Sequence, residues 1–109
     1  MIEVTIHEQS SGRIRSFEMK GHADYAEHGK DLVCAGASAV SFGAVNAVIA
    51  LTGLTPSIQQ GSDGGYLQVE FPEGHEADHD IQVILKAMVV SLQTIEQDYG
   101  QHIQIRFIK

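Results

Sequence analysis

Cys34 and His22 are the two residues whose types could together carry out nucleophilic chemistry. The chain of 109 residues contains one cysteine, which excludes an internal disulfide and a metal or redox site built from a cysteine pair. A thiol becomes an effective nucleophile when a neighbouring base, such as an imidazole, takes its proton. The separation of Cys34 and His22 along the chain neither supports nor forbids such a pair, because catalytic partners meet only in the fold.

Cys34 lies three residues after Asp31, at the start of a long segment without charged residues. Asp31 is typical of an N-cap, so the sequence predicts a helix over residues 32–52 that ends at Gly53. Cys34 would then occupy the first turn, where the helix dipole stabilises a thiolate and unpaired backbone N–H groups can stabilise an oxyanion. The alternative is a small core residue, since free cysteines are often buried. Asp31 likewise has two interpretations, as the helix cap, which we favour, and as a carboxylate that orients His22, and the two roles do not exclude each other.

His22 follows a predicted strand and opens the polar segment 21–30. His28 lies in the same segment and competes for the role of base. We favour His22, because the end of a strand holds a side chain more firmly than the middle of a loop. The alternative for His22 is an ordinary exposed loop residue.

Ser38 is four residues after Cys34 and therefore on the same face of the predicted helix. Its hydroxyl would orient the thiolate or line a substrate groove. The alternative is that Ser38 and Ser41, with the glycines of this helix, allow close packing against the sheet or a partner subunit. The sequence leaves both open, with packing favoured.

His75 and His79 are spaced as two metal ligands on one helix face can be. Their spacing straddles a predicted boundary between loop and helix, and no third ligand is fixed by spacing. We therefore interpret this region as an acidic helix start. No metal site and no cofactor are expected.

The elements that must position these residues form the order ββαββαβ. Two hairpins flank the first helix, and a second amphipathic helix precedes the last strand. The predicted strands cover residues 2–7, 14–19, 55–60, 66–71 and 103–107, with a turn at 61–65. The second helix starts near Asp78 and ends at Gly100, and its period places Gln82, Lys86, Gln93 and Glu96 outward. The predicted fold class is α+β, in two layers: a five-stranded sheet with two helices packed on one face.

Length and charge restrict the function further. With 7 Lys+Arg and 14 Asp+Glu the net charge is −7, which argues against direct nucleic-acid binding and suits a basic protein partner. The length fits a single domain, residues 1–109. The N-terminus lacks the pattern of a signal peptide. The charge-free segment is diluted by Ser, Gly and Asn and lacks flanking basic clusters, so we expect a buried core helix and no membrane partner.

The segment from Gly21 to Ser38, GHADYAEHGKDLVCAGAS, closely resembles the signature of the ribosomal-processing cysteine proteases, the Prp family. That signature is Gly-His-Ala, a short loop, Gly-x-Asp, two aliphatic residues, Cys, small residues and Ser. The positions that match are Gly21, His22, Ala23, Gly29, Asp31, Leu32, Val33, Cys34 and Ser38. Ala37 is a mild departure, since the family often has an aliphatic residue there. The length and element order resemble the family across essentially the whole chain.

The resemblance implies a cytoplasmic, homodimeric endopeptidase with a Cys–His dyad. Its substrate would be the precursor of large-subunit ribosomal protein 27, a basic protein from which a short N-terminal extension is removed. By position, Cys34 is the nucleophile and His22 the general base and later general acid. Asp31 and Ser38 would be supporting residues, and Gly21 and Gly29 would belong to a mobile loop that admits substrate.

Two other functions remain as alternatives. One is a non-catalytic ribosome-assembly or dimerisation module in which Cys34 is a structural core residue. It predicts slow alkylation of Cys34 and binding of the ribosomal protein without cleavage. The other is a thiol redox sensor, which would need an intersubunit disulfide or a small thiol because the chain has no second cysteine.

Overall fold

The computed structural model describes residues 1–62 and 64–109. Asp63, in the predicted turn over residues 61–65, lies outside the described residues. Seven elements follow one another in the predicted order. They are β1 (Ile2–Glu8), β2 (Ile14–Lys20), α1 (Leu32–Thr52), β3 (Ser57–Gln60), β4 (Tyr66–Glu70), α2 (Asp78–Tyr99) and β5 (Ile103–Ile108).

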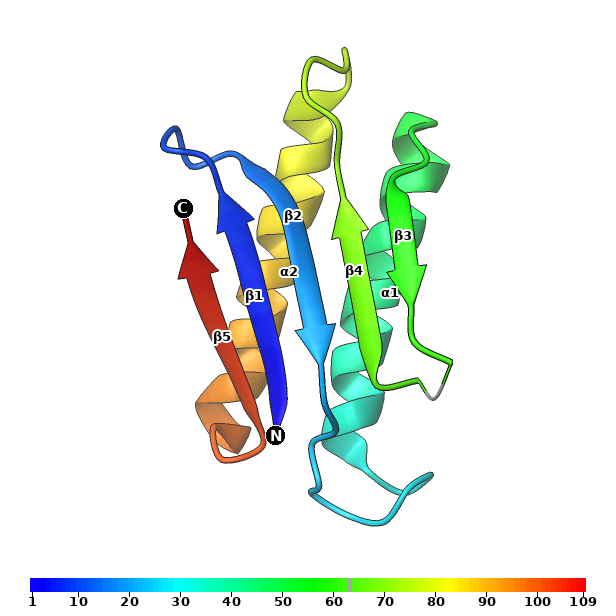
Figure 1. The fold of residues 1–109 in the computed structure, drawn as a ribbon, viewed down its shortest axis with the longest axis vertical. Helices are drawn as coiled ribbons and strands as arrows, with labels where there is room; N and C mark the ends of the chain where they lie inside the picture. The colour runs from blue at the N-terminus through cyan, green and yellow to red at the C-terminus, as the bar shows by residue number, and fades with distance from the viewer. Residues whose placement is uncertain (63) are drawn as a thin grey trace.

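The strands form one mixed sheet of five strands in the order β3-β4-β2-β1-β5. The predicted hairpins are confirmed, since β1 pairs antiparallel with β2 and β3 pairs antiparallel with β4. β5 returns to lie parallel to β1. Both helices cover the same face of the sheet (Figure 1). The α+β, two-layer architecture is therefore confirmed.

The core lies between the sheet and the two helices. Val4, Ile6 and Phe17 on the strands and Leu85 and Leu92 on α2 are fully buried. Their spacing follows the period of two for strands and of three to four for the helix that the sequence shows. Burial of this alternating apolar set is what fixes which face of each strand meets the helices.

α1 has the predicted bounds and caps. Gly53 adopts a left-handed φ of 76°, and its N–H donates to the Ile49 carbonyl at 3.0 Å. Five residues form the stripe that faces the core, namely Val33, Ala37, Ser41, Val45 and Val48. The predicted core helix is thus buried along one stripe, while the opposite face is exposed. By length and composition alone α1 could cross a membrane, and core helices of soluble proteins pass the same test.

α2 shows where the outward face was predicted wrongly. Gln82 is buried, because its amide hydrogen-bonds both the N–H and the carbonyl of Ile14 at 2.7 and 2.8 Å. Glu96 is half-buried and accepts the Ile105 N–H at 2.9 Å. These polar side chains face the sheet because they satisfy backbone groups there.

The fold brings the end of β2 close to the start of α1. Both lie at the same end of the molecule, joined by the loop over residues 21–31, with the N-terminus nearby (Figure 1). This connection contains the residues that the sequence singles out for chemistry.

Candidate active site

Cys34 lies in the first turn of α1, as predicted. The N-cap is Asp31, whose Oδ1 accepts the N–H groups of Val33 and Cys34 at 3.0 Å each. The thiol is therefore at the positive end of a helix of 21 residues. Cys34 is half-buried, so a reagent can reach the sulfur.

These same bonds correct one expectation about the helix start. The N–H groups of Val33 and Cys34 both donate to Asp31, so they are not unpaired donors for an oxyanion. The Ala35 N–H donates within the helix to the Asp31 carbonyl at 3.0 Å. Among the described residues, the N–H of Leu32 is the one in this turn without a hydrogen-bond partner. An oxyanion site needs donors beyond the capped turn.

Asp31 joins the helix to the preceding loop. Its second oxygen, Oδ2, accepts the N–H groups of Tyr25 and Ala26 at 2.9 and 3.3 Å. Burial of the carboxylate raises its pKa, but the four backbone hydrogen bonds outweigh this and leave the pKa of Asp31 below its ordinary value. In the part of the chain that the structure describes, no hydrogen bond joins Asp31 to His22. The capping interpretation of Asp31 is thus the one with direct contacts.

The sulfur of Cys34 accepts a hydrogen bond from the loop. The donor is the N–H of Ala23, 3.2 Å from Sγ. Ala23 is buried and directly follows His22. An N–H aimed at sulfur is a contact that strengthens when the acceptor carries negative charge. The loop backbone is therefore fastened to the candidate nucleophile.

His22 and Cys34 line the same pocket, of about 540 Å³. His28 and Ser38 also line it, so the competition between the two histidines persists in the fold. Both histidines are exposed, and among the described residues no hydrogen bond joins either ring to Sγ. Catalytic hydrogen bonds are often loose until substrate binds. The structure thus brings His22, Cys34 and Ser38 together without fixing the dyad contact.

A second, narrower pocket of about 160 Å³ adjoins the first. It shares His22, His28, Cys34 and Ser38 with the larger pocket. Its apolar lining includes Met19, Phe42 and Leu67. The thiol therefore lies where the larger pocket meets a smaller one with an apolar lining, an arrangement that can receive an extended chain with an apolar side chain.

The two candidate serines have different environments. Ser38 is exposed and faces the pocket. Ser41 is fully buried, with its hydroxyl 3.9 Å from the sulfur of Met19. The packing interpretation therefore holds for Ser41, whereas Ser38 is available to a bound molecule.

Glycines at both ends of the loop allow its path. Gly21 and Gly29 have φ angles of 93° and 89°, in the left-handed region that disfavours other residues. A Cβ on Gly21 would also overlap the carbonyl oxygen of Met1, whereas one on Gly29 would meet open space. The Met1 amino group donates to the His22 carbonyl at 2.5 Å. The backbone at Gly21 and His22 is thus packed tightly against Met1, the residue that precedes β1.

The structure adds residues that sequence reasoning missed. His102 Nδ1 is 3.0 Å from the Ala23 carbonyl. The Tyr25 ring packs edge-on against the rings of His102 and Tyr99, at centroid distances of 5.3 and 5.4 Å. His102 is 79 residues from Ala23 along the chain, so no local pattern could have predicted the contact.

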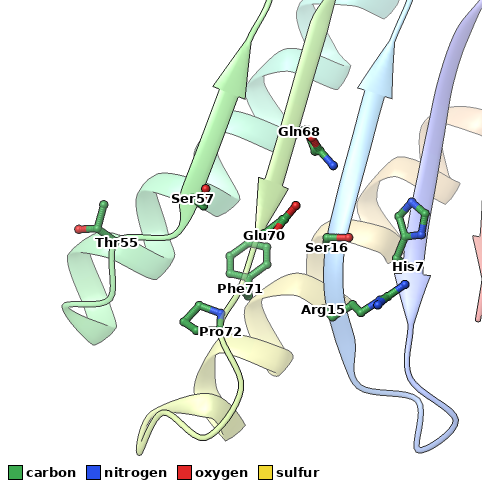
Figure 2. Close-up of a pocket in the computed structure, with 9 residues that line it drawn as sticks. All are labelled: His7, Arg15, Ser16, Thr55, Ser57, Gln68, Glu70, Phe71 and Pro72. Carbon is green, nitrogen blue, oxygen red and sulfur yellow. The ribbon is translucent and has the colours of Figure 1, made fainter.

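A larger cavity, of about 630 Å³, lies elsewhere. Figure 2 shows its polar lining near the start of β2, around Arg15, Ser16 and Glu70. Ser16 is four residues before the end of β2 at Lys20, or about 13 Å along the strand, and His22 lies beyond that end. None of the predicted site residues lines it. Size alone therefore does not identify the site.

The predicted histidine pair shows a local role. His75 Nδ1 accepts the Ala77 N–H at 3.0 Å, next to the start of α2. Among the described residues, no group of three His, Cys, Asp or Glu side chains is placed to hold a metal ion.

A half-buried thiol at a helix N-terminus, with histidines and a hydroxyl in the same pocket, is an arrangement that enzymes with a cysteine nucleophile use. The family model described as "Cysteine protease Prp" matches residues 1–104. The chain belongs to this family and is a cysteine protease.

Individual relatives agree with this assignment. The chain is 52% identical over 107 residues to the ribosomal processing cysteine protease Prp of Bacillus subtilis, with 96% of each chain covered. It is 43% identical to the protein of the same name from Staphylococcus aureus, with 98% of this chain and 99% of the relative covered.

Solved structures extend the likeness to three dimensions. The crystal structure of the Staphylococcus aureus protease Prp with a covalently linked product peptide has a TM-score of 0.91, 43% identity and coverage of 98% and 99%. The complex of that protease with a substrate peptide has a TM-score of 0.85 and 42% identity at the same coverage.

Proposed function

We propose that residues 1–109 form a single catalytic domain that removes the short N-terminal extension of the precursor of large-subunit ribosomal protein 27. The observation that carries this proposal is the position of Cys34, in the first turn of α1 and in one pocket with His22. Relatives named ribosomal processing proteases, and one with a covalently linked product peptide, support the substrate class.

The reaction is acyl transfer through Cys34. His22 takes the thiol proton, and the sulfur attacks the carbonyl carbon of the scissile peptide bond. His22 then gives the proton to the leaving amine, which departs and leaves a thioester on Cys34. A water molecule, deprotonated by His22, hydrolyses the thioester and restores the thiol.

The remaining site residues support these steps. Asp31 holds the helix start and the loop together through four backbone N–H groups. Ser38 offers its hydroxyl to the bound peptide at the mouth of the pocket. The segment between Gly21 and Gly29 serves as the loop that admits substrate, because it is exposed apart from Ala23.

The setting of the reaction follows from the same family resemblance. The enzyme acts in the cytoplasm as a homodimer, without a cofactor, a membrane or direct contact with nucleic acid. The exposed, charge-free face of α1 supports pairing with a second copy. Sedimentation equilibrium measures the mass, and a monomer at micromolar concentration would contradict the dimer.

The test is cleavage of a peptide that spans the extension and the mature start of the ribosomal protein. We expect no cleavage by Cys34→Ala and a loss of about 10²–10⁴-fold in kcat for His22→Ala. His28→Ala asks which histidine is the base, and His79→Ala, an exposed histidine outside the pocket, is the matched control.

Three outcomes would contradict the proposal. The wild-type protein could leave the peptide intact, Cys34→Ala could cleave it at an unchanged rate, or His28→Ala could abolish cleavage while His22→Ala does not. Binding without cleavage, together with slow alkylation of Cys34 by iodoacetamide, would instead indicate the non-catalytic module.

A further inference from the structure

We propose that His102 is a positioning residue that holds the backbone of Ala23 against the sulfur of Cys34. This inference rests on the proposed function of Cys34 as the nucleophile. One residue, Ala23, makes both contacts: its N–H donates to Cys34 Sγ at 3.2 Å, and its carbonyl lies 3.0 Å from His102 Nδ1. His102 therefore acts on the thiol through a single intervening residue.

The direction of the hydrogen bond from His102 follows from its partner. A carbonyl oxygen only accepts, so Nδ1 must carry the hydrogen and donate it. This assigns the proton to Nδ1 and leaves Nε2 free to serve as an acceptor in the neutral ring. The property that matters is a hydrogen-bond donor at the place of Nδ1.

The backbone of His102 is well fixed for this role. Its N–H donates to the Tyr99 carbonyl and its own carbonyl accepts the Ile2 N–H, both at 2.8 Å. These bonds tie the residue to the end of α2 and to the first residue of β1. The donor thus comes from the rigid body of the fold, whereas its acceptor belongs to an exposed loop.

Tyr25 closes the arrangement from the loop side. Its ring packs edge-on against both His102 and Tyr99, with interplanar angles of 87° and 89°. Its backbone N–H donates to Asp31. Tyr25 is therefore held by the helix cap and by the residues at and after the end of α2, while Ala23, on the other side of Asp24, is held by Cys34 and His102.

Loss of the His102 donor would free the peptide group between Ala23 and Asp24, and the Ala23 Cα joins that group to the one that carries the Ala23 N–H. The Ala23 N–H would then no longer be held in place against Sγ, although the His22 carbonyl keeps its bond to the Met1 amino group. Displacement of a catalytic group by a fraction of an ångström slows the chemical step more than it weakens substrate binding. We therefore expect the effect in kcat rather than in KM.

Three substitutions distinguish the effect of the hydrogen-bond donor at Nδ1 from the effect of a side chain at position 102. His102→Asn places an amide nitrogen near the position of Nδ1, His102→Gln carries the same amide one carbon further out, and His102→Ala removes the donor. We expect kcat of the Asn variant within threefold of wild type, and a loss of about tenfold for Gln and Ala with KM changed less than twofold.

Hydrogen exchange of the Ala23 amide, measured by NMR, gives a readout that needs no substrate. We expect protection in wild type and in His102→Asn, and exchange at least tenfold faster in His102→Gln and His102→Ala. His79→Ala controls for removal of a histidine outside the pocket. Thermal unfolding identifies the variants that remain folded. Because Asn and Gln have similar polarity, a difference between these two variants reports the position of the amide rather than a loss of stability.

Equal kcat in the Asn and Gln variants, or unchanged Ala23 exchange in the Gln variant, would overturn the inference. Failure of the proposed function has a different signature. In that case the wild-type protein would not cleave the precursor peptide, while the exchange of Ala23 would still follow the identity of residue 102.

Discussion

Asp31 divides its two carboxylate oxygens between two parts of the chain. Oδ1 accepts the N–H groups of the first helical turn, and Oδ2 accepts those of Tyr25 and Ala26. Asparagine can serve the first function, because its oxygen caps helices well. It cannot serve the second with an NH₂ group, which only donates. The loop therefore depends on the carboxylate.

This dependence predicts how stability changes with pH. The pKa of Asp31 is lower in the fold than its ordinary value of 3.8, so the carboxylate's contribution is present above pH 3.8 and is lost as the pH falls through the lowered value. Asp31→Asn does not titrate. We expect the difference in unfolding free energy between wild type and Asp31→Asn to be constant near neutral pH and to shrink at lower pH.

Urea unfolding between pH 7 and pH 3 measures this difference. Asp24→Asn, which changes an exposed carboxylate of the same loop that lies 3.6 Å from the Met1 amino group, controls for the loss of one negative charge. The prediction fails if the difference in unfolding free energy between wild type and Asp31→Asn is as large at pH 3 as at pH 7. It also fails if Asp24→Asn gives the same pH profile, because the pH dependence would then not come from the Asp31 hydrogen bonds.

At the scale of single residues, the sequence predicted the features that depend on neighbouring positions in the chain. The cap at Asp31 and the first-turn position of Cys34 depend on four consecutive positions and on well-known capping preferences. The contact of Ala23 with Sγ depends on how the loop folds back, and that of His102 depends on contact across 79 residues. Single-sequence patterns contain no information on such pairs.

At the scale of elements, α2 shows how backbone needs can override an amphipathic pattern. β1 and β2 fall out of register between His7 and Glu8, and Ile14, at the start of β2, has both backbone groups bound by Gln82. The helical period assigned Gln82 to solvent because its side chain is polar. Which backbone groups of Ile14 need a side-chain partner is visible only once the strands are paired.

We predict that Gln82→Ala destabilises the protein by about 1–3 kcal/mol, since it leaves a buried N–H and a buried carbonyl of Ile14 unpaired. Gln93→Ala, on the exposed face of the same helix, is the matched control and should change stability by less than about 0.5 kcal/mol. Urea unfolding followed by circular dichroism measures both. Equal effects would mean that water replaces the Gln82 amide without cost.

The strands were predictable where their partners are neighbours in sequence. Both hairpins follow from alternating residues on either side of a short turn. The parallel pairing of β5 with β1 joins the two ends of the chain, and no local signal specifies it. That pairing also sets the position of His102 beside the loop. One long-range contact therefore determines both the place of β5 in the sheet and the contact of His102 with Ala23.

For the whole molecule, the net charge of −7 is the property that governs encounters with a partner. A field of one sign speeds the association of an oppositely charged partner and weakens as salt screens it. The screening length falls from about 30 Å at 0.01 M to about 8 Å at 0.15 M ionic strength. The attraction between the enzyme and a basic precursor peptide should therefore extend over a longer distance at low salt.

We predict that kcat/KM for the precursor peptide falls by about tenfold between 0.01 M and 0.15 M ionic strength, while kcat changes less than twofold. The field acts on approach, whereas the chemical step takes place inside a pocket at fixed distances. Stopped reactions quantified by mass spectrometry give both constants. A peptide with the same cleavage site but glutamine in place of its basic residues is the matched control, and its kcat/KM should be nearly independent of salt. If the two peptides respond alike, or if the salt effect lies in kcat, the charge of the molecule does not steer its substrate.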